Sequence, residues 1–94
     1  MSDEIKWVSE PYGKTKGFRC PCCKFKTLYG RGQYEICKVC FWEDDGQDEP
    51  DADKVLGGPN GNLSLRDAQT NFARFGAVEE SFVSNVRRPE PDEL

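Results

Sequence analysis

The stretch CPCCKFKTLYGRGQYEICKVC, residues 20–40, contains all five cysteines of the chain. Cys20 and Cys23 form one Cys-x-x-Cys pair, Cys37 and Cys40 form a second, and thirteen residues separate the two pairs. Two thiolates at this spacing can bind one ion, because the chain curls back and its backbone N–H groups can donate hydrogen bonds to the sulfur atoms. The two pairs therefore predict a site of four thiolates.

Between the two pairs, the residues alternate in a way that is typical of a β-hairpin. On either side of Gly30 and Gly32, two sets of side chains alternate along the chain. Before the glycines, Phe25, Thr27 and Tyr29 alternate with Lys24, Lys26 and Leu28, and after them Tyr34 and Ile36 alternate with Gln33 and Glu35. Glycine can adopt the positive φ angles that such a turn needs. A hairpin would return both strand ends to one place, where both pairs can reach one ion at Zn–S distances of about 2.3 Å.

The fifth thiol, Cys22, lies between the ligands of the first pair. Cys20 and Cys23 are the better ligands, because a Cys-x-Cys pair does not form the turn that makes both sulfurs converge. Cys22 is then a small packing residue or an incidental exposed thiol. The alternative is a redox thiol, made more acidic by Lys24, Lys26 and the metal.

The donor set favours zinc as the metal. The chain has no histidine, so a transition-metal site must be built from sulfur or carboxylate. Four thiolates suit Zn²⁺, but they also bind a single iron in rubredoxin-like sites, and iron is the alternative. With four sulfur ligands no coordination position is left for water, so we expect a structural metal and no enzyme activity.

The length and composition indicate one small domain that depends on a metal. The chain has 94 residues, of which 36% are hydrophobic and 32% are charged, so its apolar core alone would be marginal. The predicted fold is a small metal-stabilised α+β domain, a zinc-ribbon β-hairpin with a long acidic loop and one packed C-terminal helix. The expected segments are a lead-in over 1–16, the hairpin over 17–42, the loop over 43–62, the helix over 63–76 and a tail over 77–94.

The acidic loop follows the second cysteine pair. It is rich in Asp, Glu, Gly, Pro and Asn and has no apolar period. The run DDGQDEPDAD, residues 44–53, resembles a calcium-binding loop in composition only. Its oxygen ligands do not follow the alternation of an EF-hand loop, and no glutamate stands at the twelfth position. A solvated surface loop is therefore the expectation.

A helix with a clear start and stop comes next. Ser64 is a good N-cap, Asp67 stands at the third helical position, and Gly76 can end the helix. Four apolar residues share one face and predict packing against the hairpin. They are Leu65, Ala68, Phe72 and Phe75. After a short turn near residues 79–84, we expect the tail RRPEPDEL to be frayed.

Taken together, the motifs resemble the cysteine-rich CPCC family of small bacterial proteins. The resemblance rests on CPCC, then YEICKVCFWEDDGQ, GGPNGNLSLRDAQTNFARFGA and VRRP, and it covers residues 18–89. Lys38 stands where proline is expected in many relatives. The resemblance implies a small bacterial cysteine-rich domain of one fold, and it implies no particular activity.

The aromatic residues after the last cysteine have two interpretations. Phe41 and Trp42 can cover the metal site and keep water from the thiolates. Alternatively, Trp42 together with Glu43, Asp44 and Asp45 can form a recognition surface for a basic protein partner. The expected function is therefore a non-catalytic zinc-binding module that mediates a protein–protein interaction. A rubredoxin-like iron protein or a thiol redox protein is the alternative.

The charge distribution argues against general binding to nucleic acid or to an anionic membrane. The formal net charge is −4, and residues 41–65 hold seven acidic residues and one basic residue. A nucleic-acid-binding ribbon remains the second alternative, because four basic residues stand near three aromatic ones in the predicted hairpin. They are Lys24, Lys26, Arg31 and Lys38, beside Phe25, Tyr29 and Tyr34. With no membrane-spanning or signal-like apolar run in the sequence, we expect a cytoplasmic protein.

Overall fold

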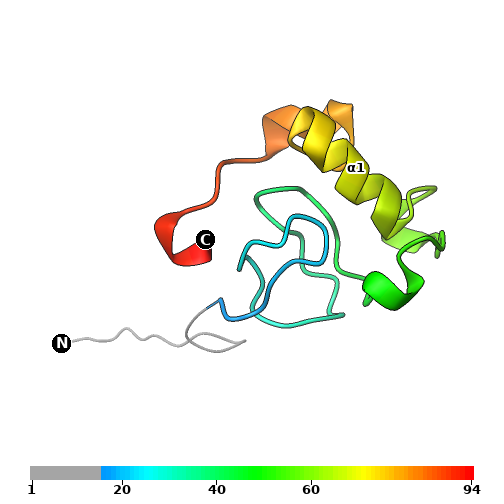
Figure 1. The fold of residues 1–94 in the computed structure, drawn as a ribbon, viewed down its shortest axis with the longest axis horizontal. Coiled ribbons are helices and arrows are strands. Elements are labelled where there is room, and N and C mark those ends of the chain that lie inside the picture. The colour runs from blue at the N-terminus through cyan, green and yellow to red at the C-terminus, as the bar shows by residue number, and fades with distance from the viewer. Residues whose placement is uncertain (1–15) are drawn as a thin grey trace.

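The computed structural model describes residues 16–94, and this part of the chain is mostly loops around one α-helix, α1 (Leu65–Phe75). Figure 1 shows α1 lying along one side of the coiled segment that carries the cysteines. Within residues 16–94, no helix is both long enough and apolar enough to cross a membrane. Four short 3-10 helices complete the described elements. They are η2 (Glu49–Asp51), η3 (Gly58–Asn60), η4 (Glu80–Asn85) and η5 (Pro91–Glu93).

The predicted zinc-ribbon hairpin and the α+β class are wrong, because residues 16–94 contain no β-strand and no sheet. Two isolated antiparallel bridges take its place. One joins Phe18 to Leu28 and the other joins Ile36 to Glu43, so each bridge closes a loop around one cysteine pair. The two expected strands do not pair with each other through their backbones: Leu28 pairs with Phe18, Tyr34 and Glu35 pair with Asp44, and the N–H of Lys26 donates to the tail.

The helix is where the sequence predicts it. The Ser64 hydroxyl accepts a hydrogen bond from the backbone N–H of Asp67 (3.0 Å), and the Asp67 carboxylate accepts one from the N–H of Ser64 (3.3 Å). Gly76 ends the helix with a φ of 88°. The apolar face is shorter than expected: Phe75 does not reach the buried core, and the Arg74 guanidinium lies 4.9 Å from the centre of its ring.

The buried core is built around the cysteines. Leu65 and Ala68 of α1 and Trp42 from the loop segment are all fully buried, and Phe72 packs partly buried against them. All five cysteines belong to the same cluster. Because so few large apolar residues are buried, the sulfur atoms form a substantial part of the interior.

The acidic segment, residues 43–62, contains η2 and η3 but no α-helix or strand, and it is not simply solvated. The carboxylate of Asp44 is fully buried and accepts hydrogen bonds from Arg31 Nε (2.8 Å), Gly32 N (2.7 Å) and Gly46 N (3.2 Å). Gln47 is also fully buried, and its amide nitrogen donates to the carbonyl of Asp51 (2.8 Å). The start of this segment is therefore folded around the buried carboxylate of Asp44, which pairs with the half-buried Arg31.

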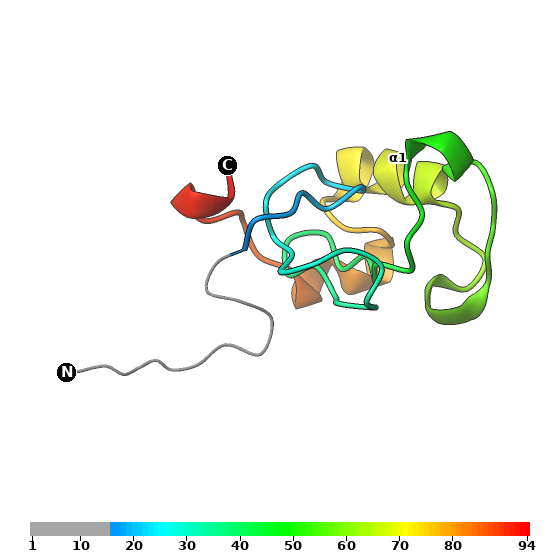
Figure 2. The ribbon, with the colours of Figure 1, turned by 90° about the horizontal axis from the view of Figure 1, so that it is seen from below.

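The C-terminal tail is ordered and is not frayed. It runs back along the cysteine segment, and its last turn (red in Figure 1 and Figure 2) lies beside the first described residues. Glu93 is fully buried and pairs with Arg87 (2.8 Å) and Lys16 (2.7 Å). The backbone N–H of Lys26 donates to the carbonyl of Glu93 (2.7 Å). These contacts tie the tail to the first cysteine loop.

Candidate metal centre

The four cysteines of the two pairs converge in the interior. Their Sγ atoms all lie within 4.8 Å of one another, and all four residues are buried. Two close contacts cross between the pairs: Cys20 Sγ lies 3.6 Å from Cys40 Sγ, and Cys23 Sγ lies 3.7 Å from Cys37 Sγ. Among residues 16–94, no other group of three or more cysteine, aspartate or glutamate ligand atoms is gathered so closely.

These distances fit a tetrahedral metal ion. With Zn–S bonds of about 2.3 Å, the four sulfurs of a regular tetrahedron stand about 3.8 Å apart. The two cross-pair distances of 3.6 and 3.7 Å are close to that value. The sequence prediction that both pairs meet at one centre holds, although the hairpin that was expected to bring them together does not form.

The first pair sits in a tight hydrogen-bonded loop. The backbone N–H of Cys20 donates to the carbonyl of Phe25 (2.9 Å), and the N–H of Lys24 donates to the carbonyl of Cys20 (2.8 Å). This arrangement places Lys24 at a φ of 72°. The loop therefore turns sharply and directs both sulfurs inward.

The second pair repeats the same arrangement. The N–H of Cys37 donates to the carbonyl of Trp42 (2.9 Å), and the N–H of Phe41 donates to the carbonyl of Cys37 (2.8 Å). Phe41 has a φ of 75°, which matches the equivalent residue of the first loop. Two copies of one loop, facing each other, thus supply two sulfurs each.

The surroundings of the sulfurs include polar donors. The N–H of Val39 donates to Cys37 Sγ (3.4 Å), and the Thr27 hydroxyl lies 3.0 Å from the same sulfur. The pKa of Cys37 is lowered, chiefly by the nearby thiol of Cys20, whereas the pKa of Cys40 is raised, chiefly by the same thiol. A divalent cation would favour the thiolate form of all four groups and release their protons.

The family comparison agrees with this arrangement. The family model described as Cysteine-rich CPCC matches residues 18–93. The chain belongs to the cysteine-rich CPCC family. The match runs from the first cysteine loop through α1 to the last turn, so the family unit includes nearly all of the described fold. Neither the comparison with curated proteins nor the comparison with solved structures found a match.

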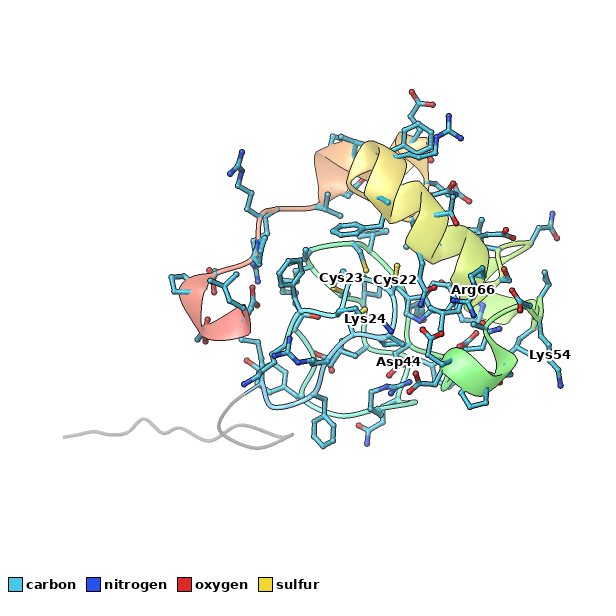
Figure 3. The ribbon with its side chains drawn as sticks, viewed as in Figure 1. Cys22, Cys23, Lys24, Asp44, Lys54 and Arg66 are labelled. Carbon is cyan, nitrogen blue, oxygen red and sulfur yellow. The ribbon has the colours of Figure 1, made fainter. Side chains whose placement is uncertain are left out.

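The extra thiol of this CPCC-family chain, Cys22, lies outside the group of four. It is only 4% exposed and packs in the core, on the side of the cysteine cluster that faces α1 (Figure 3). The ammonium group of Lys24 is paired with Glu49 (3.0 Å). The position of Cys22 agrees with the packing interpretation, and its burial limits the access that oxidants would need.

The four residues predicted to meet a partner are not on one surface. Trp42 and Asp44 are fully buried, whereas Glu43 and Asp45 are half-buried. The indole N–H of Trp42 has no hydrogen-bond partner within the described structure. Trp42 therefore fits the first interpretation, that of a cover beside the sulfur cluster.

The basic residues of the predicted hairpin are not a free cationic patch. Arg31 is paired with Asp44 and Asp48, and Lys24 with Glu49. These ion pairs neutralise two of the four charges on which binding to nucleic acid would depend. The sequence offered no sign of them, because each joins residues more than ten positions apart.

Proposed function

We propose that this CPCC-family protein is a non-catalytic module whose fold is held together by one structural Zn²⁺. The ion would be bound by Cys20, Cys23, Cys37 and Cys40. The observation that carries this proposal is the convergence of four buried sulfurs at distances close to those of a tetrahedral site.

A structural role follows from the donor set. Four thiolates fill a tetrahedral shell, so there is no position at which a water molecule could be activated. Zinc is favoured over iron because a closed site that serves the fold needs no redox chemistry. Zinc bound here would join the two cysteine loops and replace apolar packing that a chain of this size lacks.

The biological role that we propose is binding to a protein partner, with a surface of negative overall charge. The formal net charge of the chain is −4, and a divalent ion on four thiolates adds two further negative charges. A partner with a basic segment would complement this charge. Three of the described basic residues in the first half of the chain, Lys16, Lys24 and Arg31, are already used in internal ion pairs.

Metal analysis of the purified protein tests the proposal. We expect about one zinc per chain, and loss of the circular-dichroism signal of the fold when a chelator removes it. Cys20→Ser, Cys23→Ser, Cys37→Ser and Cys40→Ser should each abolish tight zinc binding, whereas Cys22→Ser is the matched control and should keep it. A red protein that contains iron would show that the site binds iron and not zinc. A chain that stays folded without metal would overturn the proposal.

A further inference from the structure

A hollow of about 180 Å³ lies against the second cysteine loop. Ile36, just before Cys37, and Phe41, just after Cys40, form one wall. Leu63 and Phe82 contribute further apolar surface. A cavity of about 150 Å³ can hold a benzene-sized group, so this hollow has room for one large apolar side chain.

The wall is fixed in place by the candidate metal centre. The rings of Phe41 and Phe82 pack with centroids 4.7 Å apart, and the N–H of Val78 donates to the carbonyl of Cys40 (2.9 Å). Ile36 nevertheless stays 41% exposed. The hollow is therefore an open, largely apolar site whose lining is packed against the second cysteine loop.

Two acidic residues, Glu43 and Glu79, are among the residues that line the hollow, and we call them its rim. Glu79 accepts a hydrogen bond from the Ser81 hydroxyl (3.2 Å), and neither carboxylate forms an ion pair with a described lysine or arginine. In contrast, the acidic residues that stabilise the fold are paired with lysine or arginine. They are Asp44, Asp48, Glu49 and Glu93. The charge of the rim is thus available to an external cation.

We propose that this hollow binds a linear segment of a partner protein that presents one large apolar side chain next to a lysine or arginine. The apolar side chain would enter between Ile36, Phe41 and Phe82, and the cation would face Glu43 and Glu79. This inference deepens the proposed function and rests on it, because the metal loop builds one wall of the hollow. An apolar pocket with two acidic residues in its lining suits a short peptide that carries an apolar side chain next to a cation.

Peptide titration of the full, zinc-loaded, ¹⁵N-labelled chain tests this proposal by NMR. The probe is a synthetic peptide with one leucine flanked by two arginines. We expect amide shift changes centred on Ile36, Phe41 and Phe82. A peptide with alanine in place of the leucine should bind about tenfold more weakly, because the buried apolar surface is lost. A peptide with glutamates in place of the arginines should bind more weakly still.

Matched variants separate the hollow from the rest of the surface. Glu79→Gln should weaken binding about threefold, whereas Glu80→Gln, at the exposed neighbouring position, should not. Ile36→Ser should weaken binding, whereas Val83→Ser, at a similarly exposed valine outside the hollow, should leave it unchanged. The folded state of each variant is checked from its amide spectrum.

Three results would overturn the proposal: no shift changes at millimolar peptide, equal binding of the leucine and alanine peptides, or equal effects of the two glutamine variants. Zinc content is measured on the same samples. Absence of zinc from a folded chain would therefore count against the structural metal, while a negative titration of a zinc-loaded chain would count against the peptide site alone.

Discussion

Lys24 and Phe41 have nearly the same left-handed backbone conformation, with φ angles of 72° and 75°, and each directly follows the second cysteine of its pair. Glycine adopts this conformation without strain, whereas other residues do so at a cost of about 1 kcal/mol or more. The strained conformation occurs in both loops because it lets the backbone N–H at this position donate a hydrogen bond to the carbonyl of the first cysteine. The repeated loop is the local structure that gathers the four sulfurs.

Substitution of Lys24 measures the strain directly. Lys24→Gly and Lys24→Ala both lose the exposed ion pair with Glu49, so the difference between them reports the backbone conformation. We expect the glycine variant to be more stable than the alanine variant by about 1 kcal/mol. Denaturant unfolding of both zinc-loaded variants gives this difference. An alanine variant as stable as the glycine variant would show that the position is not left-handed.

Substitution of Asp44 tests whether the acidic segment is part of the fold. Asp44→Asn removes the charge that faces Arg31 in the interior, and we expect the free energy of unfolding to fall by about 3 kcal/mol. Asp53→Asn is the control, because Asp53 forms only an exposed ion pair with Arg66 and should change stability by less than about 1 kcal/mol. Similar losses in the two variants would contradict the buried role of Asp44.

Glu93 in the C-terminal tail should make the free energy of unfolding depend on pH. The pKa of Glu93 is lowered to about 2 from an ordinary value of 4.5, chiefly because Arg87 donates to its carboxylate. A lowered pKa contributes stability that is fully present above pH 4.5 and is lost as the pH falls toward 2. Glu93→Gln should therefore be less stable than the wild type by a margin that is constant from pH 7 to 5 and narrower at pH 4.

Denaturant unfolding at each pH with saturating zinc measures this margin. Asp92→Asn is the control, because the Asp92 side chain is largely exposed and lies 3.9 Å from Lys16. Its effect should be small at every pH. A margin for Glu93→Gln that widens on acidification would have the wrong sign and would reject this account of the tail.

The N-cap of α1 supports the helix that covers the cysteine cluster. Ser64→Ala removes the hydroxyl that accepts from Asp67, and we expect a loss of about 1 kcal/mol in the free energy of unfolding. Thr70→Ala, at an exposed position within the same helix, should be neutral or slightly stabilising because alanine favours helix. Thermal or denaturant unfolding of both variants tests whether Ser64→Ala is less stable than Thr70→Ala.

The sequence predicted the features that depend on short-range spacing. The two cysteine pairs specified the four converging sulfurs, and Ser64, Asp67 and Gly76 specified both ends of α1. Each Cys-x-x-Cys pair and each capping signal lies within a few residues and has a direct stereochemical meaning, whereas the meeting of the two pairs was predicted through a hairpin that does not form. The cysteine pairs and the ends of the helix can therefore be recognised without knowledge of the rest of the chain.

The features that the sequence did not predict depend on contacts between distant residues. Alternation over residues 25–36 is equally compatible with a hairpin and with two loops that each close on themselves. The structure has the two loops, because the N–H groups of Cys20 and Cys37 each donate to a carbonyl five residues further along the chain. The pairing of Arg31 with Asp44 and the burial of Glu93 have no periodic pattern at all. From the sequence alone, charged residues in such segments are expected to be exposed to solvent, because their ion-pair partners cannot be identified.

X-ray absorption at the zinc edge of the purified protein tests the central claim most directly. The account predicts one zinc per chain with four sulfur neighbours at about 2.3 Å, and the same spectrum for Cys22→Ser. A first shell that contains nitrogen or oxygen, or fewer than four sulfurs, would contradict the assignment of Cys20, Cys23, Cys37 and Cys40 as the ligands.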